Sequence, residues 1–283
     1  MTILYVTSFN EKFFECTGKA MVESFTDQQV NGDLLITRDG LETKDYQMWL
    51  EGIRSKRRGA LEIGHNVYDY CLDYDPMLHV WVEDNASIIP KVHGGLYTQK
   101  NCDDKGCPGK IGEWKGHFKN CPGGGWNYRA AGWFRKIVSL NHALHLGQQY
   151  RAIIFVDSDT LFTRTLAPSY VYNVFGGYDM FYHRGPVRTA KKTSIESGFI
   201  GWHEGCGYDL LQRVINEFTS GEFRQYPRWD DGYVFWRVVD KYQGAYKVKD
   251  IAGKEATLDT LEHGPFAEYV THNKGTHMRE GLT

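Results

Sequence analysis

The stretch IIFVDSDTLF, residues 153–162, decides the fold and the chemistry to be expected of this chain. Four apolar residues, β-branched or aromatic, end abruptly in Asp157, Ser158 and Asp159, so the run is typical of a buried strand rather than a helix. Two carboxylates at a buried strand end are costly to desolvate unless a positive charge neutralises them. Hard divalent cations take oxygen ligands and often join carboxylates to substrate phosphates.

Ligands of an open α/β sheet sit outside the carboxyl ends of its strands. The stretch therefore predicts a strand that delivers Asp157 and Asp159 to a metal-bound diphosphate. A solvated turn or a helix N-cap is the alternative interpretation of the Asp-Ser-Asp triplet.

The whole chain has the size and composition of a soluble globular protein. Its 283 residues form one large domain or two small ones, with 41% hydrophobic and 24% charged residues. A net charge of −2 gives no global basic field for nucleic acid or an anionic membrane. The sequence shows no run of transmembrane length and no basic-then-apolar leader, which predicts a soluble, cytoplasmic protein.

Apolar runs and turn residues predict alternating strands and helices. Strands are expected at residues 3–9, 32–37, 153–156, 178–182 and 196–202, with a short or edge strand at 79–82. Helices are expected at residues 17–25, 45–56, 127–146, 208–218 and 233–239. The first strand, helix and strand form a βαβ unit, which is expected to be parallel and right-handed.

Four segments in order resemble a known family: ILYVTSFN, IIFVDSDTLF, ESGFIGW with WDDGYVF, and THNKGTHMR. The order resembles metal-dependent glycosyltransferases of the GT-A fold, in particular the glycogenin-like and galactosyl- or xylosyltransferase-like group. The resemblance implies an α/β, Rossmann-like nucleotide-diphospho-sugar transferase with a mixed, mainly parallel central sheet flanked by helices. It also implies one domain, 1–283, with a nucleotide-sugar-binding half at 1–160 and an acceptor-binding half with a metal-binding tail at 161–283.

The resemblance also assigns a metal site. It makes Asp157 and Asp159 ligands, and the third ligand is His272 in an H-x-x-G pattern that ends at Gly275. Imidazole suits Mn²⁺ better than Mg²⁺, which favours manganese. The family continues with Lys-Pro-Trp, whereas this chain has THMR at 276–279, which leaves open whether Lys274, His277 or Arg279 contacts the diphosphate.

Donor contacts follow from the same resemblance. They are expected at strand ends, on the helix before the metal strand and in the tail: Thr7, Ser8, Asn10, Arg129, Lys136, Asp157, Ser158, Lys274 and Gly275. For the basic residues on the helix, ordinary surface charge is the alternative.

The resemblance also offers three acidic residues as catalytic candidates, Asp231, Asp230 and Glu196. In an inverting enzyme Asp230 or Asp231 would be the general base on the acceptor hydroxyl. One aspartate of the pair is expected to cap the following helix while the other faces the sugar and acceptor. We expect Asp231 to be the second, because Gly232 beside it permits close approach. In the family's retaining members a glutamine stands where this chain has Gly232. The resemblance favours retention, whereas the departure at Gly232 leaves both retention and inversion open.

Residues 94–125 are rich in Cys and Gly and show little periodicity, which predicts an irregular excursion. Cys102, Cys107, His117 and Cys121 have the ligand types of a structural Zn²⁺ site, although their spacing is not a standard one. Free thiols are the leading interpretation, and a disulfide between Cys102 and Cys107 is a third.

The predicted function is transfer of a sugar from a nucleotide-diphosphate sugar, expected to be a UDP-sugar, to a hydroxyl of a glycan or glycoconjugate acceptor. A nucleotidyltransferase would need a Gly-rich basic loop after the first strand, where this chain has TSFNEK. A phosphohydrolase with a nucleophilic aspartate would carry its Asp-x-Asp after the first strand. A carbohydrate-binding module would suit the 14% aromatic content but would not need two carboxylates and a histidine.

Overall fold

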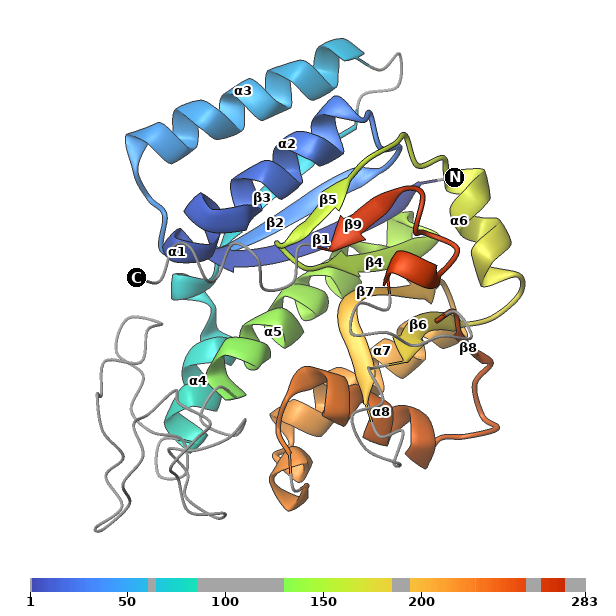
Figure 1. The fold of residues 1–283 in the computed structure, drawn as a ribbon. Coiled ribbons are helices and arrows are strands. Elements are labelled where there is room, and N and C mark those ends of the chain that lie inside the picture. Colours follow the sequence, from blue (N-terminus) through green and yellow to red (C-terminus); the bar gives the residue numbers. More distant parts are fainter. Residues whose placement is uncertain are drawn as a thin grey trace, which may run out of the picture.

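The computed structural model describes residues 2–60, 65–85, 130–184, 194–226, 228–252 and 261–272. A seven-stranded sheet in the order β3-β2-β1-β4-β7-β6-β8 runs through the molecule, and helices cover both of its faces (Figure 1). None of the described helices combines the length and the apolar character that crossing a membrane requires.

The sheet has a parallel part and an antiparallel part. Its strands are β1 (Ile3–Asn10), β2 (Asp33–Asp39), β3 (Val67–Cys71), β4 (Ala152–Val156), β6 (Met180–Arg184), β7 (Ile195–His203) and β8 (Val248–Asp250). Strands β3, β2, β1 and β4 are parallel to one another, β7 is antiparallel to both β4 and β6, and β8 is parallel to β6. The predicted fold class, a mixed and mainly parallel sheet flanked by helices, is confirmed.

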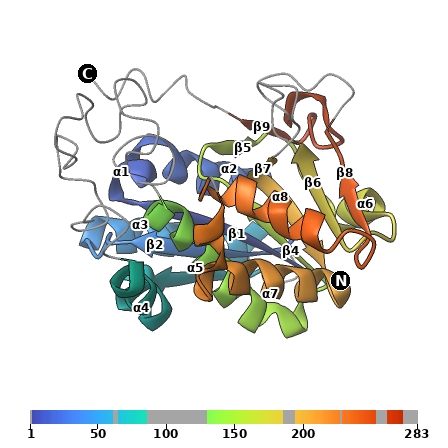
Figure 2. The same cartoon turned by 90° about the horizontal axis from the view of Figure 1, so that it is seen from below.

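Two helical layers enclose the sheet. The helices are α1 (Glu11–Phe13), α2 (Lys19–Asp27), α3 (Lys44–Ala60), α4 (Pro76–Asn85), α5 (Ala130–Leu146), α6 (Pro168–Phe175), α7 (Cys206–Thr219) and α8 (Asp231–Lys241). One apolar core lies under α2, α3 and α6, and the other lies under α4, α5, α7 and α8, the layer nearest the viewer in Figure 2.

Strand β4 shows why its sequence is continuously apolar. Ile153 and Phe155 belong to one core, whereas Ile154 and Val156 belong to the other. Successive side chains of a strand point to opposite faces, so a strand covered on both faces needs apolar residues at every position.

The structure corrects the prediction of a strand or edge at 79–82, because these residues lie in α4. The Asp75 carboxylate accepts a hydrogen bond from Leu78 N at 2.9 Å, and Pro76 occupies the first helical position. Buried Leu78, Trp81 and Asn85 then recur at helical spacing. The Asp-Pro start signal was the missed evidence. Strand β3 was also missed, and the predicted strand at 178–182 begins instead at Met180, after a turn in which Tyr178 N donates to Phe175 O.

A small second sheet matters for the site. Strands β5 (Thr160–Phe162) and β9 (Val270–His272) pair antiparallel, with Thr160 opposite His272. This pairing places His272 beside the Asp-Ser-Asp triplet. His272 and Asp159 of the triplet are 113 positions apart in the sequence.

A buried carboxylate ties together the amino ends of the parallel strands, on the far edge of the sheet from the triplet. Asp33 accepts hydrogen bonds from Tyr150 Oη at 2.6 Å, Asn66 N at 2.9 Å and Asn66 Nδ2 at 3.2 Å, and His65 Nδ1 lies 3.4 Å away. Desolvation opposes ionisation, but the hydrogen bonds from His65, Tyr150 and Asn66 outweigh it and lower the pKa of Asp33.

We expect Asp33→Asn to reduce the free energy of unfolding at pH 7 by about 1.5–3 kcal/mol, the range for hydrogen bonds to a charged group. A lowered pKa contributes stability above the unfolded value of about 3.9, and that stability is lost as the pH falls through the folded value. The difference between wild type and variant should therefore shrink below pH 4. Urea unfolding at several pH values measures it, and a difference that is constant down to pH 3 would contradict the assignment. Tyr150→Phe, which removes one donor, should have a smaller effect.

Candidate metal and donor site

The Asp-Ser-Asp triplet forms a tight turn from β4 into β5. Asp157 N donates to Gly198 O at 2.8 Å, which continues the pairing of β4 with β7, and Thr160 N donates to Asp157 O at 3.0 Å. The triplet does not cap a helix, because β5 follows directly. The side chains of Asp157, Ser158 and Asp159 are partly buried rather than fully solvated.

Three candidate ligands converge at this turn. The ligand atoms of Asp157, Asp159 and His272 all lie within 4.8 Å of one another, and His272 Nε2 is 2.9 Å from Asp159 Oδ1. The His272 side chain is 1% exposed, so it is fixed by packing, while Asp159 is 27% exposed. Two carboxylates and one imidazole fit a divalent transition-metal ion that keeps further positions open for substrate oxygens.

Gly198 on β7 allows these ligands to approach one another. A Cβ atom at this position would lie 3.0 Å from Asp157 Oδ2, 3.4 Å from Glu196 Oε1 and 3.4 Å from His272 Cε1. A side chain at this position would therefore press against both the Asp157 carboxylate and the His272 imidazole. Glu196, one of the predicted catalytic residues, lies on this same side of β7 and is partly exposed.

The opposite side of Asp157 faces a buried lysine. Lys136 Nζ on α5 lies 3.0 Å from Asp157 Oδ1, 2.6 Å from Asp231 Oδ2 and 3.1 Å from Ser197 Oγ. It also sits 4.5 Å from the centre of the Phe155 ring. Lys136 thus contacts Oδ1 of Asp157, whereas Oδ2 is the oxygen that lies toward Gly198. Desolvation alone would lower the pKa of Lys136, but the carboxylates of Asp157 and Asp231 outweigh it and raise that pKa, so the lysine is charged.

The two aspartates before α8 have different environments. Asp230 accepts the capping hydrogen bond from Tyr233 N at 3.0 Å and a two-pronged contact from Arg228 at 2.8 and 3.0 Å. Asp231 instead points inward to Lys136. Burial raises the pKa of Asp230, with Arg228 acting against it.

Gly232 was predicted to permit close approach of the sugar or acceptor beside Asp231, but its close neighbour in the structure is protein backbone. A Cβ atom at Gly232 would lie 2.2 Å from Ile195 O, so the close approach is to the backbone of β7. No side chain fits here without moving the strand or the helix.

The residues at the carboxyl end of β1 differ in accessibility. Thr7 is fully buried, and its carbonyl oxygen accepts a hydrogen bond from Thr37 Oγ1 at 3.0 Å. Ser8 and Asn10 are partly exposed, and Asn10 Oδ1 caps α1 by accepting from Phe13 N at 2.9 Å. Of the three predicted nucleotide contacts, Ser8 and Asn10 therefore have side chains open to a ligand. Thr17, which was not predicted, reaches the triplet, with its Oγ1 3.4 Å from Ser158 Oγ.

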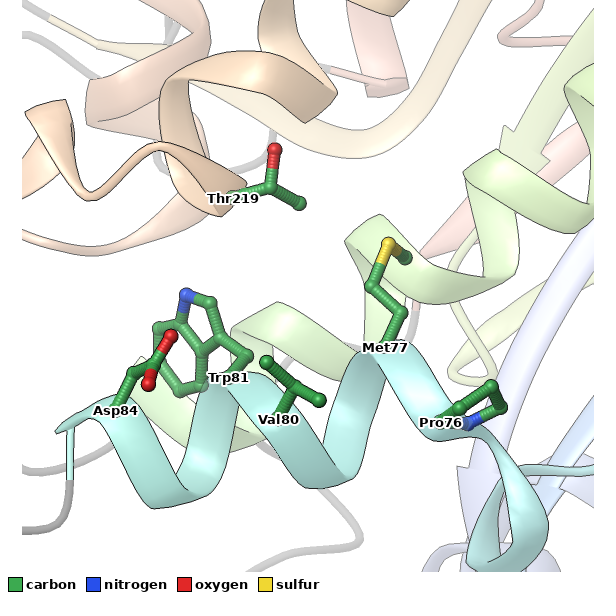
Figure 3. A pocket seen from close by; sticks show the side chains of 6 residues that line it. All are labelled: Pro76, Met77, Val80, Trp81, Asp84 and Thr219. Carbon is green, nitrogen blue, oxygen red and sulfur yellow. The ribbon is translucent and has the colours of Figure 1, made fainter.

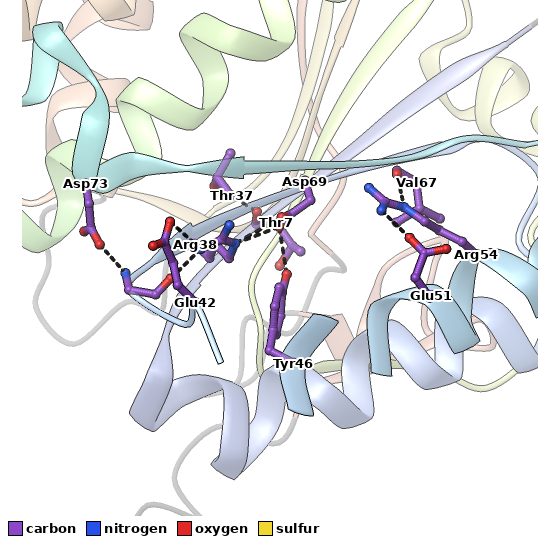
Figure 4. A network of polar contacts seen from close by, with 11 residues as sticks. Thr7, Thr37, Arg38, Glu42, Tyr46, Glu51, Arg54, Val67, Asp69 and Asp73 are labelled. Atoms are coloured by element: carbon purple, nitrogen blue, oxygen red, sulfur yellow. Dashed lines mark hydrogen bonds and ion pairs between the residues drawn. The ribbon is translucent and has the colours of Figure 1, made fainter. Parts of the chain in front are cut away.

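A polar network fixes the neighbouring carboxyl ends of β2 and β3 (Figure 4). Arg38 Nε is 3.1 Å from both carboxylate oxygens of Asp69, and Tyr46 Oη donates to Asp69 at 2.8 Å. Gly40 N donates to Asp73 Oδ2 at 3.0 Å. These bonds hold the loop after β2 in place next to the end of β1.

Several predicted residues lie outside the described residues. They are Arg129, Lys274, Gly275, His277 and Arg279, and the four zinc candidates Cys102, Cys107, His117 and Cys121.

A shallow apolar cavity of about 290 Å³ lies elsewhere, between α4 and the end of α7 (Figure 3). It is lined by Pro76, Met77, Val80, Trp81, Asp84 and Thr219. It contains none of the predicted site residues.

No protein-family model matches the chain, and no curated protein matches it. Among solved structures, mouse xyloside xylosyltransferase 1 in its apo form is similar over 98% of this chain and 99% of that chain, with 9% identity and a TM-score of 0.49. The apo structure of the bifunctional glycosyltransferase WbbM is similar over 89% of this chain and 39% of that chain, with 10% identity and a TM-score of 0.48.

The glycosyltransferase GlyE of Streptococcus pneumoniae TIGR4 is similar over 88% of this chain and 46% of that chain, with 11% identity and a TM-score of 0.45. This chain thus spans less than half of the WbbM and GlyE chains. At these identities the likeness concerns overall fold, and the chemistry has to be argued from the chain's own residues.

Proposed function

We propose that this protein is a metal-dependent glycosyltransferase, which moves a sugar from a nucleotide-diphosphate sugar to a hydroxyl of a glycan or glycoconjugate acceptor. The observation that carries the proposal is the convergence of Asp157, Asp159 and His272 at the carboxyl end of β4, where ligands of open α/β sheets bind. The buried Lys136 beside them adds a positive charge suited to a diphosphate or to the sugar next to it.

Asp157, Asp159 and His272 would hold the cation, for which Mn²⁺ is favoured over Mg²⁺ because of the imidazole. A bound divalent ion neutralises the diphosphate and stabilises the charge that develops on the leaving group. Ser8 and Asn10 are the accessible candidates for the nucleotide side, with Ser158 at the turn itself.

The environment of Asp231 argues against a role as general base. Desolvation opposes its ionisation, but Lys136 and hydrogen bonds from Ser197 Oγ and Gly232 N, at 2.7 and 2.8 Å, lower the pKa of Asp231. A general base works best with a pKa near the operating pH. We therefore propose that Asp231 holds Lys136 and contributes negative charge near the sugar. This role favours a retaining reaction over an inverting one in which Asp231 would abstract the acceptor proton.

Two other enzyme classes use Asp-x-Asp after a strand. A sugar-activating nucleotidyltransferase needs a Gly-rich loop after β1, whereas here the Asn10-capped helix α1 follows directly. A phosphohydrolase would release phosphate without transferring a sugar. A carbohydrate-binding module would bind glycans without a cation or a nucleotide. The division into donor and acceptor halves, the UDP-sugar and the cytoplasmic location remain predictions.

A panel of nucleotide sugars tests the proposal. We expect thermal stabilisation by at least one UDP-sugar that requires Mn²⁺, together with slow Mn²⁺-dependent hydrolysis that releases nucleoside diphosphate and free sugar. Release of nucleoside monophosphate or inorganic phosphate would favour the other enzyme classes. Glycan binding without any nucleotide effect would favour the binding module.

We expect His272→Ala to weaken Mn²⁺ binding by about tenfold or more, because the loss of a group that only orients a metal ligand already has an effect of that size. His272 is held by β9, so its removal takes away a fixed ligand rather than a mobile one. Electron paramagnetic resonance of free Mn²⁺ measures the affinity directly. His263→Ala, at an exposed histidine of the same region, is the control. Equal Mn²⁺ affinities of the two variants would remove His272 from the site.

A further inference from the structure

The hydroxyl of Ser197 joins two charged groups of the site. It lies on β7, where the residue is 7% exposed, and its Oγ donates to Asp231 Oδ2 at 2.7 Å. The same Oγ accepts from Lys136 Nζ at 3.1 Å. A carboxylate only accepts and an ammonium only donates, so both partners together fix the direction of the hydroxyl.

Lys136 has three N–H donors, and the structure offers three side-chain acceptors. These are Asp157 Oδ1, Asp231 Oδ2 and Ser197 Oγ. A lysine side chain is long and flexible, so the acceptors at its tip determine where its charge lies. Asp231 and Ser197 are both buried, whereas Asp157 is 32% exposed and is also a candidate metal ligand. Asp231 and Ser197 are therefore the two acceptors that hold Lys136 without also being candidate metal ligands.

We infer that Ser197 is a positioning residue for glycosyl transfer, which fixes the ammonium of Lys136 beside Asp157 through its hydroxyl. The inference rests on the proposed function. Ser197 itself would not contact the reacting atoms. It would affect turnover only through Lys136 and Asp231.

Ser139 on α5 provides a matched comparison. It is buried like Ser197, and its Oγ donates to Arg135 O at 2.7 Å and lies within hydrogen-bond distance of Thr37 Oγ1. Any buried hydroxyl needs partners of this kind. Ser197 differs because its partners are two charged side chains of the site.

The test compares Ser197→Ala with Ser139→Ala and with Ser197→Thr, which keeps the hydroxyl. The readouts are kcat and KM for Mn²⁺-dependent hydrolysis of the most active UDP-sugar, Mn²⁺ affinity and melting temperature. We expect Ser197→Ala to lower kcat by about ten- to a hundredfold, as for loss of a hydrogen bond to a charged group, with KM and Mn²⁺ affinity nearly unchanged. Ser197→Thr should restore most of kcat, and Ser139→Ala should affect only melting temperature.

A kcat of Ser197→Ala equal to that of Ser139→Ala would overturn the inference. If Ser197→Ala does not fold, the threonine variant and Ser197→Cys, a weak donor, replace it, and equal kcat values for these two would also overturn it. A wild-type protein that hydrolyses no nucleotide sugar would instead overturn the proposed function, and the inference with it.

Discussion

Replacing either Asp157 or Asp159 by Asn should lower turnover at least about a thousandfold, because each change removes a carboxylate that would bind a cation worth several kcal/mol to the transition state. The two variants should differ in stability. Asp159 contacts His272 at the partly exposed edge, so Asp159→Asn should keep the wild-type melting temperature. Asp157 also neutralises Lys136, so Asp157→Asn should melt lower.

Mn²⁺ binding and single-turnover hydrolysis of a UDP-sugar measure the two effects separately. Asp209→Asn serves as the control, because Asp209 is an exposed aspartate of α7 that pairs with Arg213 away from the triplet. Wild-type turnover by Asp159→Asn would show that the three convergent ligands do not form the catalytic centre.

Sequence reasoning could predict β4 and the position of the triplet because the signal is local. An apolar run that ends in two carboxylates needs no knowledge of distant contacts, and the same holds for the parallel βαβ unit of β1 and β2. The convergence of His272 with Asp159 is different. The pattern around His272 pointed to it, but its position depends on the pairing of β5 with β9, which brings together residues 113 positions apart.

The lysine cluster could not be predicted from the sequence for the same reason. Lys136 was expected near a diphosphate, yet its contacts with Ser197 and Asp231 require that β7 pairs with β4 and that α8 packs on the start of β7. The sequence separations of Lys136, Ser197 and Asp231 do not indicate that these strands pair or that this helix packs there. The error at α4 had a local cause, since Asp75 and Pro76 signalled a helix start that the apolar residues after them obscured.

The charged triangle of Lys136, Asp157 and Asp231 leads to the second large effect. Lys136→Met should lower turnover about a hundred- to a thousandfold, the range for losing one preorganised donor. It should also destabilise the protein by about 3–5 kcal/mol, because Asp231 is left buried without its countercharge. In the absence of a nucleotide sugar, this variant should bind Mn²⁺ several-fold more tightly than the wild type. No ammonium then lies 3.0 Å from Asp157 Oδ1 to repel the cation.

The double variant Lys136→Met with Asp231→Asn separates charge balance from catalysis. Removing both charges should recover most of the lost stability, since the unpaired carboxylate is gone, and the two single variants should therefore not add. Turnover should stay as low as in Lys136→Met, because a methionine cannot stabilise the leaving group. Unfolding in urea and single-turnover hydrolysis are measured for the wild type, the two single variants and the double variant, which together form a double-mutant cycle. Recovery of turnover in the double variant would mean that Lys136 serves only to neutralise Asp231, and additive losses of stability would mean that the two side chains do not interact. If Lys136 acts as proposed, the cycle will show strong coupling in stability, while the turnover of the double variant stays at the level of Lys136→Met.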